Sequence, residues 1–377
     1  MRKVTLAAGA ALMAAAPAFA QSRYNLPPPV TPVAREIYDL HIEMMWVCVG
    51  IFVVVFGVMF YAIWKHRKSV GHVASQFHES TTVEIVWTVV PLLILIVMAI
   101  PATRVLLQLK DTSNPDITIK ATGYQWKWGY DYLDGEGQGI SLLSMLSTTR
   151  DEIEGNAPKS ENYLLEVDTP ITVPIGKKVR ILTTADDVIH SWWVPAFGIK
   201  QDAIPGYVRD TWFKAEKEGV YRGQCAELCG KEHGFMPIVV NVVSQQAYTE
   251  WVAEQKKKAA GQTAEGAKTW TKPALLARGE QVYDHVCAAC HQVNGQGVPH
   301  AFPSLDGSQV VLGPPKQQVK LVLSGRRGMF TAESQMPSQA MLSDADLAAA
   351  ITYTRNAWTN KAADDVVQPR EVKAARN

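Results

Sequence analysis

Two long stretches without a charged side chain constrain this chain most. Residues 44–64 and 85–103 contain no Asp, Glu, Lys or Arg. Each is about 20 residues long, which is the length that a helix needs to cross roughly 30 Å of hydrocarbon. We therefore expect a two-helix transmembrane hairpin, with spans at about 44–64 and 85–106. Two prolines in the second span, Pro91 and Pro101, are compatible with a membrane helix whose neighbours satisfy the freed carbonyl groups.

The flanking residues predict how this hairpin is oriented. Residues 1–20 have a short basic start, an apolar core and a closing Ala-Phe-Ala, which is typical of a signal peptide. The loop after the first span begins with the basic residues 65–68, and such a loop stays in the cytoplasm. Residues 21–111 are therefore expected to form an N-terminal segment and a membrane anchor. Both ends of the mature chain and the soluble region should lie on the exported side.

The cysteines are arranged for cofactors rather than for disulfides. Four of the five fall in two spaced pairs, and each pair has a histidine close behind it. The pairs are Cys225 and Cys229, and Cys287 and Cys290; Cys48 lies in the first span, where it serves as a small apolar side chain. The formal net charge of +1 argues against nucleic-acid binding.

Residues 224–237 place metal-binding side chains of several kinds on one short loop. Cys225 and Cys229 offer thiolates, His233 an imidazole and Met236 a thioether. Copper in electron-transfer sites prefers this ligand set. A disulfide or a structural zinc site are the alternatives, but neither explains the methionine.

The spacing of the two cysteines indicates two metal ions. Thiolates four residues apart on a tight loop can both point inward, so that each bridges the same two coppers. Each copper then needs one imidazole and one weak axial donor, and the loop supplies only one histidine. His190 is the best candidate for the second, because it ends an apolar, strand-like run and precedes two tryptophans.

The region around this loop has the pattern of an all-β domain, expected at residues 112–245. Short alternating runs separated by turn residues occur from about residue 115 to residue 243. Five aromatic residues occupy every second position, which in one strand puts them on one face: Tyr124, Trp126, Trp128, Tyr130 and Tyr132. A domain of this kind and size predicts a sandwich, with the metal loop joining two strands at one end.

The C-terminal third of the chain predicts a separate helical domain. Residues 246–272 read as a helix followed by a flexible linker that is small and polar at 261–268. A helical run then leads into Cys287-Ala-Ala-Cys290-His291, which is the attachment motif of c-type haem. Two thiols one turn apart reach two vinyl groups of a porphyrin, and the following imidazole binds the iron from the same side. A redox dithiol or a zinc site is less well supported, because no second cysteine pair lies nearby.

A methionine is expected as the sixth ligand of the iron, because it raises the reduction potential of a histidine-ligated haem. Met336 is favoured over Met329 and Met341, since it precedes a proline and stands shortly before the closing helix. The helical domain is expected at residues 273–358. The polar tail, residues 359–377, is expected to be disordered.

The copper loop resembles the binuclear copper (CuA) loop of subunit II of haem–copper cytochrome c oxidases, and the resemblance covers roughly residues 35–245. It implies a cupredoxin-like Greek-key sandwich. The backbone carbonyl of Glu227 would be the remaining axial donor, and its side chain would touch a magnesium ion shared with the catalytic subunit. Trp126, in a motif similar to residues 123–128, would be the exposed port for electrons. The sequence departs from the family pattern at Tyr124 and Lys127.

The start of the second span resembles the family at Glu84, where the corresponding glutamate is associated with proton uptake into the neighbouring subunit. A capping box formed with Thr81 explains the same residue equally well. Two acids before His190, Asp186 and Asp187, resemble docking positions for a donor, and a solvated loop is an equally good reading.

A second resemblance, to class I cytochromes c, covers residues 273–358. Together the two imply a subunit II with a fused cytochrome c, in the inner membrane of a bacterium. Electrons would pass from a periplasmic cytochrome c or similar donor through the haem and the copper pair to the catalytic subunit I. A subunit III is also implied. Oxygen reduction and proton pumping would occur outside this chain, because its spans contain no set of histidines.

Three other kinds of protein share part of this pattern. Nitrous oxide reductases carry a similar copper loop but should also have a large histidine-rich propeller. A periplasmic copper-binding or delivery protein explains the loop but not the haem motif. Quinol oxidase subunits resemble the anchor and the sandwich but lack the copper ligands that this chain has.

Overall fold

The computed structural model describes residues 25–71, 73, 78–327 and 335–376, and they form two compact units. The first unit comprises the chain up to Ser113 together with residues 195–199 and 213–216. The second comprises the remaining residues, from Asn114 onward. The predicted signal peptide at residues 1–20 lies outside the described residues.

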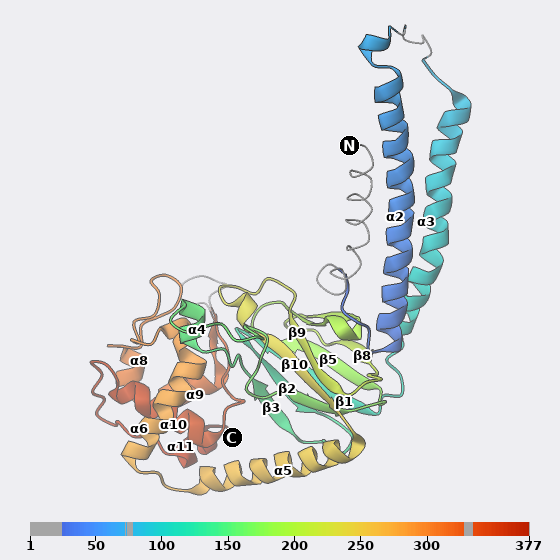
Figure 1. Cartoon of the computed structure of the whole chain (residues 1–377). Coiled ribbons are helices and arrows are strands. Elements are labelled where there is room, and N and C mark those ends of the chain that lie inside the picture. The colour runs from blue at the N-terminus through green and yellow to red at the C-terminus, as the bar shows by residue number, and fades with distance from the viewer. Residues whose placement is uncertain (1–24, 72, 74–77, 328–334, 377) are drawn as a thin grey trace, which may run out of the picture. The chain divides into compact units, whose positions relative to one another are not determined.

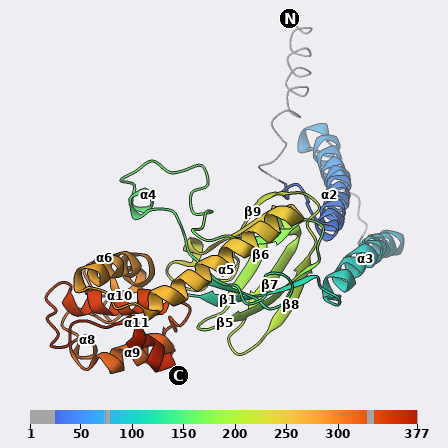
Figure 2. The same ribbon diagram turned by 90° about the horizontal axis from the view of Figure 1, so that it is seen from below.

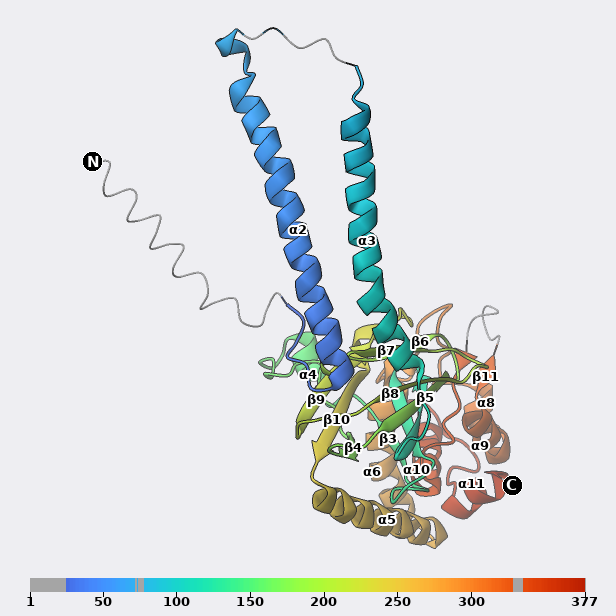
Figure 3. The same ribbon diagram turned by 90° about the vertical axis from the view of Figure 1, so that its right-hand side faces the viewer.

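The first unit is built on two long helices, α2 (Pro32–Lys65) and α3 (Thr81–Lys110), which lie side by side as a hairpin (Figure 3). Both are long and apolar enough to cross a membrane. Helix α2 begins at a proline, and the Oγ1 atom of Thr31 accepts a hydrogen bond from the amide of Ala34. The apolar side chains of both helices face outward, as expected for helices that contact lipid or other subunits. A short 3-10 turn, η2 (Lys68–Val70), lies in the basic loop after α2.

The second unit contains a sandwich of two five-stranded sheets (Figure 1). One sheet has the order β3-β2-β1-β5-β8 and the other the order β4-β10-β9-β6-β7. The strands of the first are β3 (Ser141–Ser144), β2 (Lys127–Tyr132), β1 (Ile117–Tyr124), β5 (Val179–Ala185) and β8 (Arg209–Phe213). Those of the second are β4 (Ile171–Pro174), β10 (Pro237–Val243), β9 (Gly219–Cys225), β6 (His190–Val194) and β7 (Ile199–Ala203). A short 3-10 turn, η3 (Pro195–Phe197), follows β6, and another, η4 (His233–Phe235), precedes β10.

The five alternating aromatic residues do not share the face of one strand, which corrects the expectation from their spacing. Strand β1 ends at Tyr124, a two-residue turn follows, and β2 begins at Lys127. The two strands are antiparallel, and Gly123 pairs with Trp128. A two-residue turn preserves even spacing, so alternation alone could not reveal it. Trp126 therefore lies in the turn at the end of the sandwich.

Residues 135–162, a mainly polar segment that we call the insertion, are an ordered part of the sandwich domain. The insertion includes β3, which pairs with β2, and a five-residue helix, α4 (Arg150–Glu154). A capping box begins this helix, because Thr149 and Glu152 each accept a hydrogen bond from the other's backbone amide.

The expected flexible linker is helical instead. Helix α5 (Gln245–Ala267) covers almost all of the small, polar residues 261–268, and Figure 2 shows it as one continuous rod. Ser244 caps its start, and Trp251 packs against Tyr132 of the sandwich with ring centroids 5.4 Å apart. Alanine and glutamine supply enough helix propensity to continue the helix through the two glycines.

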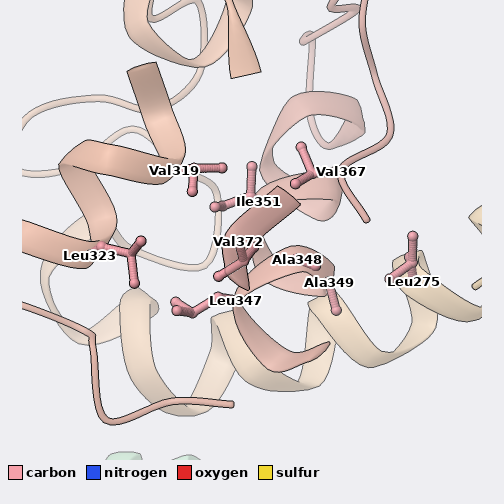
Figure 4. Close-up of a cluster of buried hydrophobic side chains, with 9 residues drawn as sticks. All are labelled: Leu275, Val319, Leu323, Leu347, Ala348, Ala349, Ile351, Val367 and Val372. Carbon is pink, nitrogen blue, oxygen red and sulfur yellow. The ribbon is translucent and has the colours of Figure 1, made fainter. Parts of the chain in front are cut away.

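The C-terminal domain is helical, and its apolar core is shown in Figure 4. Its helices are α6 (Lys272–Val282), η5 (Tyr283–Cys287, a π-helical turn), α7 (Ala288–His291), α8 (Gln309–Leu312), α9 (Pro315–Ser324), α10 (Asp344–Asn356) and α11 (Pro369–Arg376). Two short strands, β11 (Arg326–Arg327) and β12 (Gln335–Met336), pair with each other. Helices α6 and α10 cross closely at Gly279, where an added Cβ would lie 2.1 Å from the carbonyl oxygen of Ala349.

The expected disordered tail also folds. Helix α11 lies within residues 359–377, and Val367 and Val372 are fully buried in the core of Figure 4. The two valines stand five residues apart in a polar segment, which composition alone does not distinguish from a solvated tail.

Candidate functional site

The loop between β9 and β10 brings the predicted copper ligands together in two sets. The Sγ atoms of Cys225 and Cys229 are 3.9 Å apart, and both thiols are free. Cys225 Sγ lies 3.9 Å from His190 Nδ1, and Cys229 Sγ lies 3.4 Å from His233 Nδ1. Each thiol therefore has one imidazole beside it.

The two axial donors expected from the sequence follow the same division. The carbonyl oxygen of Glu227 lies 3.4 Å from the sulfur of Cys225. The Sδ atom of Met236 lies 3.6 Å from the sulfur of Cys229. Two thiols, two imidazoles, a thioether and a carbonyl in this arrangement form a donor set that suits two copper ions. A disulfide between the cysteines is excluded here by the distance between their sulfurs.

His190 is held in place by an acid that sequence reasoning had assigned elsewhere. His190 Nε2 donates a hydrogen bond to Asp187 Oδ1 at 2.8 Å, and both side chains are completely buried. This bond leaves Nδ1 free to bind a metal. Asp187 Oδ2 accepts a second bond from the amide of Gln125 at 2.6 Å. Asp187 is therefore not the solvated or docking residue that its position suggested.

The position of the His190 ring explains why residue 123 is a glycine. A Cβ added to Gly123 would lie 2.7 Å from the His190 ring, so only glycine admits the imidazole at this point of β1. Burial alone would lower the pKa of His190, but the carboxylate of Asp187 and the sulfur of Cys225 raise it above its ordinary value.

The paired thiols favour the loss of the first proton. A hydrogen bond from Cys229, together with those from His190 and from backbone groups, lowers the pKa of Cys225 to about 3. The hydrogen bond to Cys225 in turn raises the pKa of Cys229. A thiolate is the form that binds copper, so Cys225 is prepared for a metal at neutral pH.

Trp126 is bonded directly to the copper loop. Its Nε1 atom donates to the carbonyl oxygen of Cys229 at 3.1 Å, and Gln125 Nε2 donates to the same oxygen at 2.8 Å. The Trp126 ring also meets Phe302 edge to face, with centroids 6.5 Å apart. The side chain is buried, although the sequence had predicted an exposed port.

Glu84 lies in the first turn of α3, far along the chain from these ligands. Its Oε1 atom accepts a hydrogen bond from the amide of Ser80 at 3.4 Å. A capping box has two such bonds. This one is formed, and it involves Ser80 rather than Thr81.

The haem motif of the sequence lies at the wall of one cavity in the helical domain. Cys287, Cys290, His291 and Met336 all line it, together with apolar side chains such as Leu321 and Ile351. His291 Nδ1 donates to the carbonyl oxygen of Pro303 at 2.9 Å, which leaves Nε2 free for iron. Burial lowers the pKa of His291, so the imidazole is neutral at neutral pH and can act as a ligand. The apolar cavity with these four side chains fits a c-type haem.

The three candidate methionines are separated by their positions. Met336 lines the cavity, whereas Met341 is not among its lining residues and has its sulfur next to Gly129 of the sandwich. Met329 lies outside the described residues. The geometry thus favours Met336.

Lys127, where the sequence departs from the family pattern, also lines this cavity. Its ammonium group is almost fully buried and donates to Gln339 Oε1 at 2.8 Å. Burial lowers the pKa of Lys127. Sequence reasoning missed this contact, as it missed the ion pair between Arg150 and Glu232 beside the copper loop. Neither pair is visible in the sequence, because its members are far apart along the chain.

Three protein-family models match successive parts of the chain. A model of the transmembrane domain of cytochrome c oxidase subunit II matches residues 20–105, and a model of its periplasmic domain matches residues 117–243. A cytochrome c model matches residues 276–358.

Individual relatives show the same likeness. The chain is 40% identical to a probable cytochrome c oxidase subunit 2 of Rickettsia bellii over 233 residues, which is 62% of this chain and 84% of that protein. It is 39% identical to the cytochrome c oxidase subunit 2 of Cereibacter sphaeroides over 240 residues, covering 61% and 79% of the two chains. The periplasmic domain of subunit II of cytochrome oxidase of Bradyrhizobium japonicum, whose crystal structure is known, is 45% identical in sequence to this chain. It covers 39% of this chain and 98% of that chain, with a TM-score of 0.35.

Proposed function

Because the chain belongs to the cytochrome c oxidase subunit II family, we propose that it is the subunit through which electrons enter a bacterial respiratory oxidase. As part of a haem–copper terminal oxidase, it belongs to an oxidoreductase. The observation that carries the proposal is the pairing of each cysteine sulfur with one histidine nitrogen, Cys225 with His190 and Cys229 with His233. A pair of copper ions held there would accept and release one electron as a unit, and a covalent haem held in the C-terminal cavity would accept and release another.

The residues of the loop have distinct roles in this proposal. Cys225 and Cys229 would hold the copper ions through their thiolates, and His190 and His233 would each supply an imidazole. Met236 and the carbonyl of Glu227 would supply the remaining, weaker donors. The sandwich holds these groups in place before a metal arrives, and the buried pair of Asp187 and His190 supports that role.

The C-terminal domain supplies the preceding step. Cys287 and Cys290 would attach the haem, His291 and Met336 would hold its iron, and the apolar cavity would exclude water from it. A cytochrome c or similar periplasmic donor would deliver electrons to this domain. The contact between Phe302 and Trp126, and the hydrogen bond from Trp126 to Cys229, support a route from the cavity to the copper loop.

The membrane anchor places these centres beside their partners. We propose an inner-membrane location with the sandwich and the cytochrome domain on the periplasmic side, next to a catalytic subunit I and a subunit III. Subunit I would receive the electrons, reduce oxygen to water and pump protons. The side chain of Glu227 would bind a magnesium ion shared with that subunit, and Glu84 would assist proton uptake into it.

Metal analysis combined with electron paramagnetic resonance of the purified chain tests the proposal. We expect two coppers and one covalent haem per chain, and a copper signal split by two equivalent nuclei. A single copper, a zinc ion, or a signal split by one nucleus would contradict it. The full chain rather than a fragment should be used, in detergent.

A further inference from the structure

The insertion at residues 135–162 is joined to the copper loop by an ion pair. Both terminal nitrogens of Arg150, the first residue of α4, lie 3.3 Å from Glu232 Oε1. Glu232 immediately precedes His233 in the loop. A side chain of the insertion therefore contacts the residue next to a proposed copper ligand.

Burial makes this pair different from an ordinary surface ion pair. The Glu232 side chain is 9% exposed, whereas that of Arg150 is 47% exposed. A carboxylate that has lost its water requires a partner, while the arginine can remain partly hydrated. Arg150 thus covers a buried negative charge from the solvent side.

Arg150 is itself held firmly by the insertion. The capping box of Thr149 and Glu152 fixes the first turn of α4. The carboxylate of Glu152 also accepts a hydrogen bond from the amide of Ser160 at 2.9 Å, which ties the end of the insertion back to its helix. The guanidinium group is therefore presented from an ordered support rather than from a free loop.

A second pair fastens the other side of the same loop. Arg222 lies in β9, three residues before Cys225, and its Nε atom donates to Glu166 Oε1 at 3.0 Å. Glu166 follows the insertion in the sequence. Its neighbour Val167 forms a β-bridge with Leu146 of the insertion. The segment 145–167 is thereby attached to the strand that leads into the copper loop and, through Arg150, to the part that carries His233.

We propose that Arg150 is a positioning residue of the copper centre. By pairing with Glu232 it holds the segment that carries His233 and neutralises a buried negative charge beside the metal. The insertion then serves as a brace for the loop. This inference rests on the proposed function, because it takes His233 as a copper ligand.

Four variants of the full chain test the inference: Arg150→Gln, Glu232→Gln, the double variant of both, and Arg180→Gln as a control. Arg180 pairs with Asp210 in the opposite sheet at 2.7 Å, and both of those side chains are about one-third exposed. Copper loss to a chelator, the midpoint potential of the copper signal and the histidine couplings in electron–nuclear double resonance are measured for each.

We expect Arg150→Gln to lose copper about 10-fold faster than the unmodified chain, because Arg150 supports the residue next to His233 and so should act at the lower end of the range for groups that orient metal ligands. Its copper potential should fall, because a positive charge near the metal is removed. Glu232→Gln should raise the potential. The double variant should return both measurements towards the original values, because no buried charge is then left without a partner.

Two results would overturn the inference. One is an Arg150→Gln variant that matches the Arg180→Gln control in copper retention, potential and histidine coupling. The other is a double variant that is as impaired as Arg150→Gln. If Arg150→Gln does not fold, two other variants decide: the nearly isosteric Glu232→Gln should raise the potential, and the charge-retaining Arg150→Lys should leave it close to the original value. A potential that Glu232→Gln leaves unchanged would then overturn the inference. A chain that never binds two coppers contradicts the proposed function instead, so the two failures are distinguishable.

Discussion

Asp187 and His190 are three residues apart and form a fully buried hydrogen bond of 2.8 Å at the edge of the copper loop. The carboxylate can only accept, so the bond fixes the proton on Nε2 and turns Nδ1 towards Cys225. One acid thus determines how a proposed copper ligand of the neighbouring strand is oriented. The same acid holds the turn that carries Trp126, through the amide of Gln125.

Replacing Asp187 by asparagine should weaken copper binding about 10-fold to 100-fold, because the amide is a poorer acceptor and leaves the imidazole free to rotate. Asp186→Asn is the control, since that residue is not bonded to His190. Competition with a copper chelator measures the affinity. Equal losses in both variants would contradict the role of Asp187.

The copper-free chain adds a pH dependence to this prediction. The pKa of His190 is raised above its ordinary value of 6.5, so its protonation stabilises the fold fully below about pH 6.5. That stabilisation is lost as the pH rises through the raised pKa. Asp187→Asn should reduce it, which can be followed by NMR titration of the His190 ring and by denaturation at several pH values.

Removing the ring of Trp126 should slow electron transfer between the haem domain and the copper loop. Trp126→Leu loses both the contact with Phe302 and the hydrogen bond to Cys229. Gln125→Leu loses a hydrogen bond to the same oxygen but no ring, so it is the matched control. Gln125→Leu should cost about 1 kcal/mol of unfolding free energy. Trp126→Leu should cost more, because it also removes the packing of a buried ring.

Flash photolysis of the full chain separates the two variants of this pair. Only Trp126→Leu should transfer electrons more slowly, whereas each variant should lose one hydrogen bond to the carbonyl oxygen of Cys229. If the glutamine variant is slowed as much as the tryptophan variant, the ring is not part of the route.

Met336→Ala should lower the midpoint potential of the haem and convert the iron to the high-spin state, because a methionine ligand raises the potential and its loss opens a coordination position. Met341→Ala is the control, since Met341 does not line the cavity. Optical redox titration measures both variants. The assignment fails if Met341→Ala, and not Met336→Ala, changes the spin state.

The sequence predicts this site better than it predicts the connections around it. Most of the proposed ligands of each centre lie in short motifs, and local spacing alone brings Cys225, Cys229, His233 and Met236 onto one loop. His190 is predicted because it ends an apolar, strand-like run before two tryptophans, although in the structure it is the first residue of β6. The β-hairpin turn at residues 125–126, by contrast, preserves the alternation of a single strand and leaves no local signal.

Partners that are distant along the chain were beyond reach of the sequence. Arg150 and Glu232 are 82 residues apart, and Lys127 and Gln339 are 212 residues apart. Their pairing depends on the tertiary fold, which no local pattern encodes. Helices over residues 261–267 and 369–376 were missed for a related reason, since composition describes a segment without the surface on which it packs.

Helix α11 should contribute to the stability of the cytochrome domain. Val372→Ala removes two methyl groups from a fully buried site in the apolar core, which also includes residues of α10. It should lower the free energy of unfolding by about 2 kcal/mol. Lys373→Ala, on the exposed side of the same helix, should have little effect. Thermal unfolding of the full chain, followed at the haem, tests this, and equal stability of the two variants would show that the helix does not pack there.

Glu84→Gln should separate the two roles of this residue at the start of α3. The glutamine side chain keeps an oxygen that can accept the hydrogen bond from Ser80, so the helix and the copper and haem signals should be unchanged. Because glutamine cannot take up or release a proton, the assembled oxidase should take up protons more slowly. Glu79→Gln, which changes a nearby acid of the same loop, is the control. Proton uptake by the oxidase in vesicles is measured with a pH-sensitive dye, and an unchanged rate in Glu84→Gln would leave this residue only its role at the helix start.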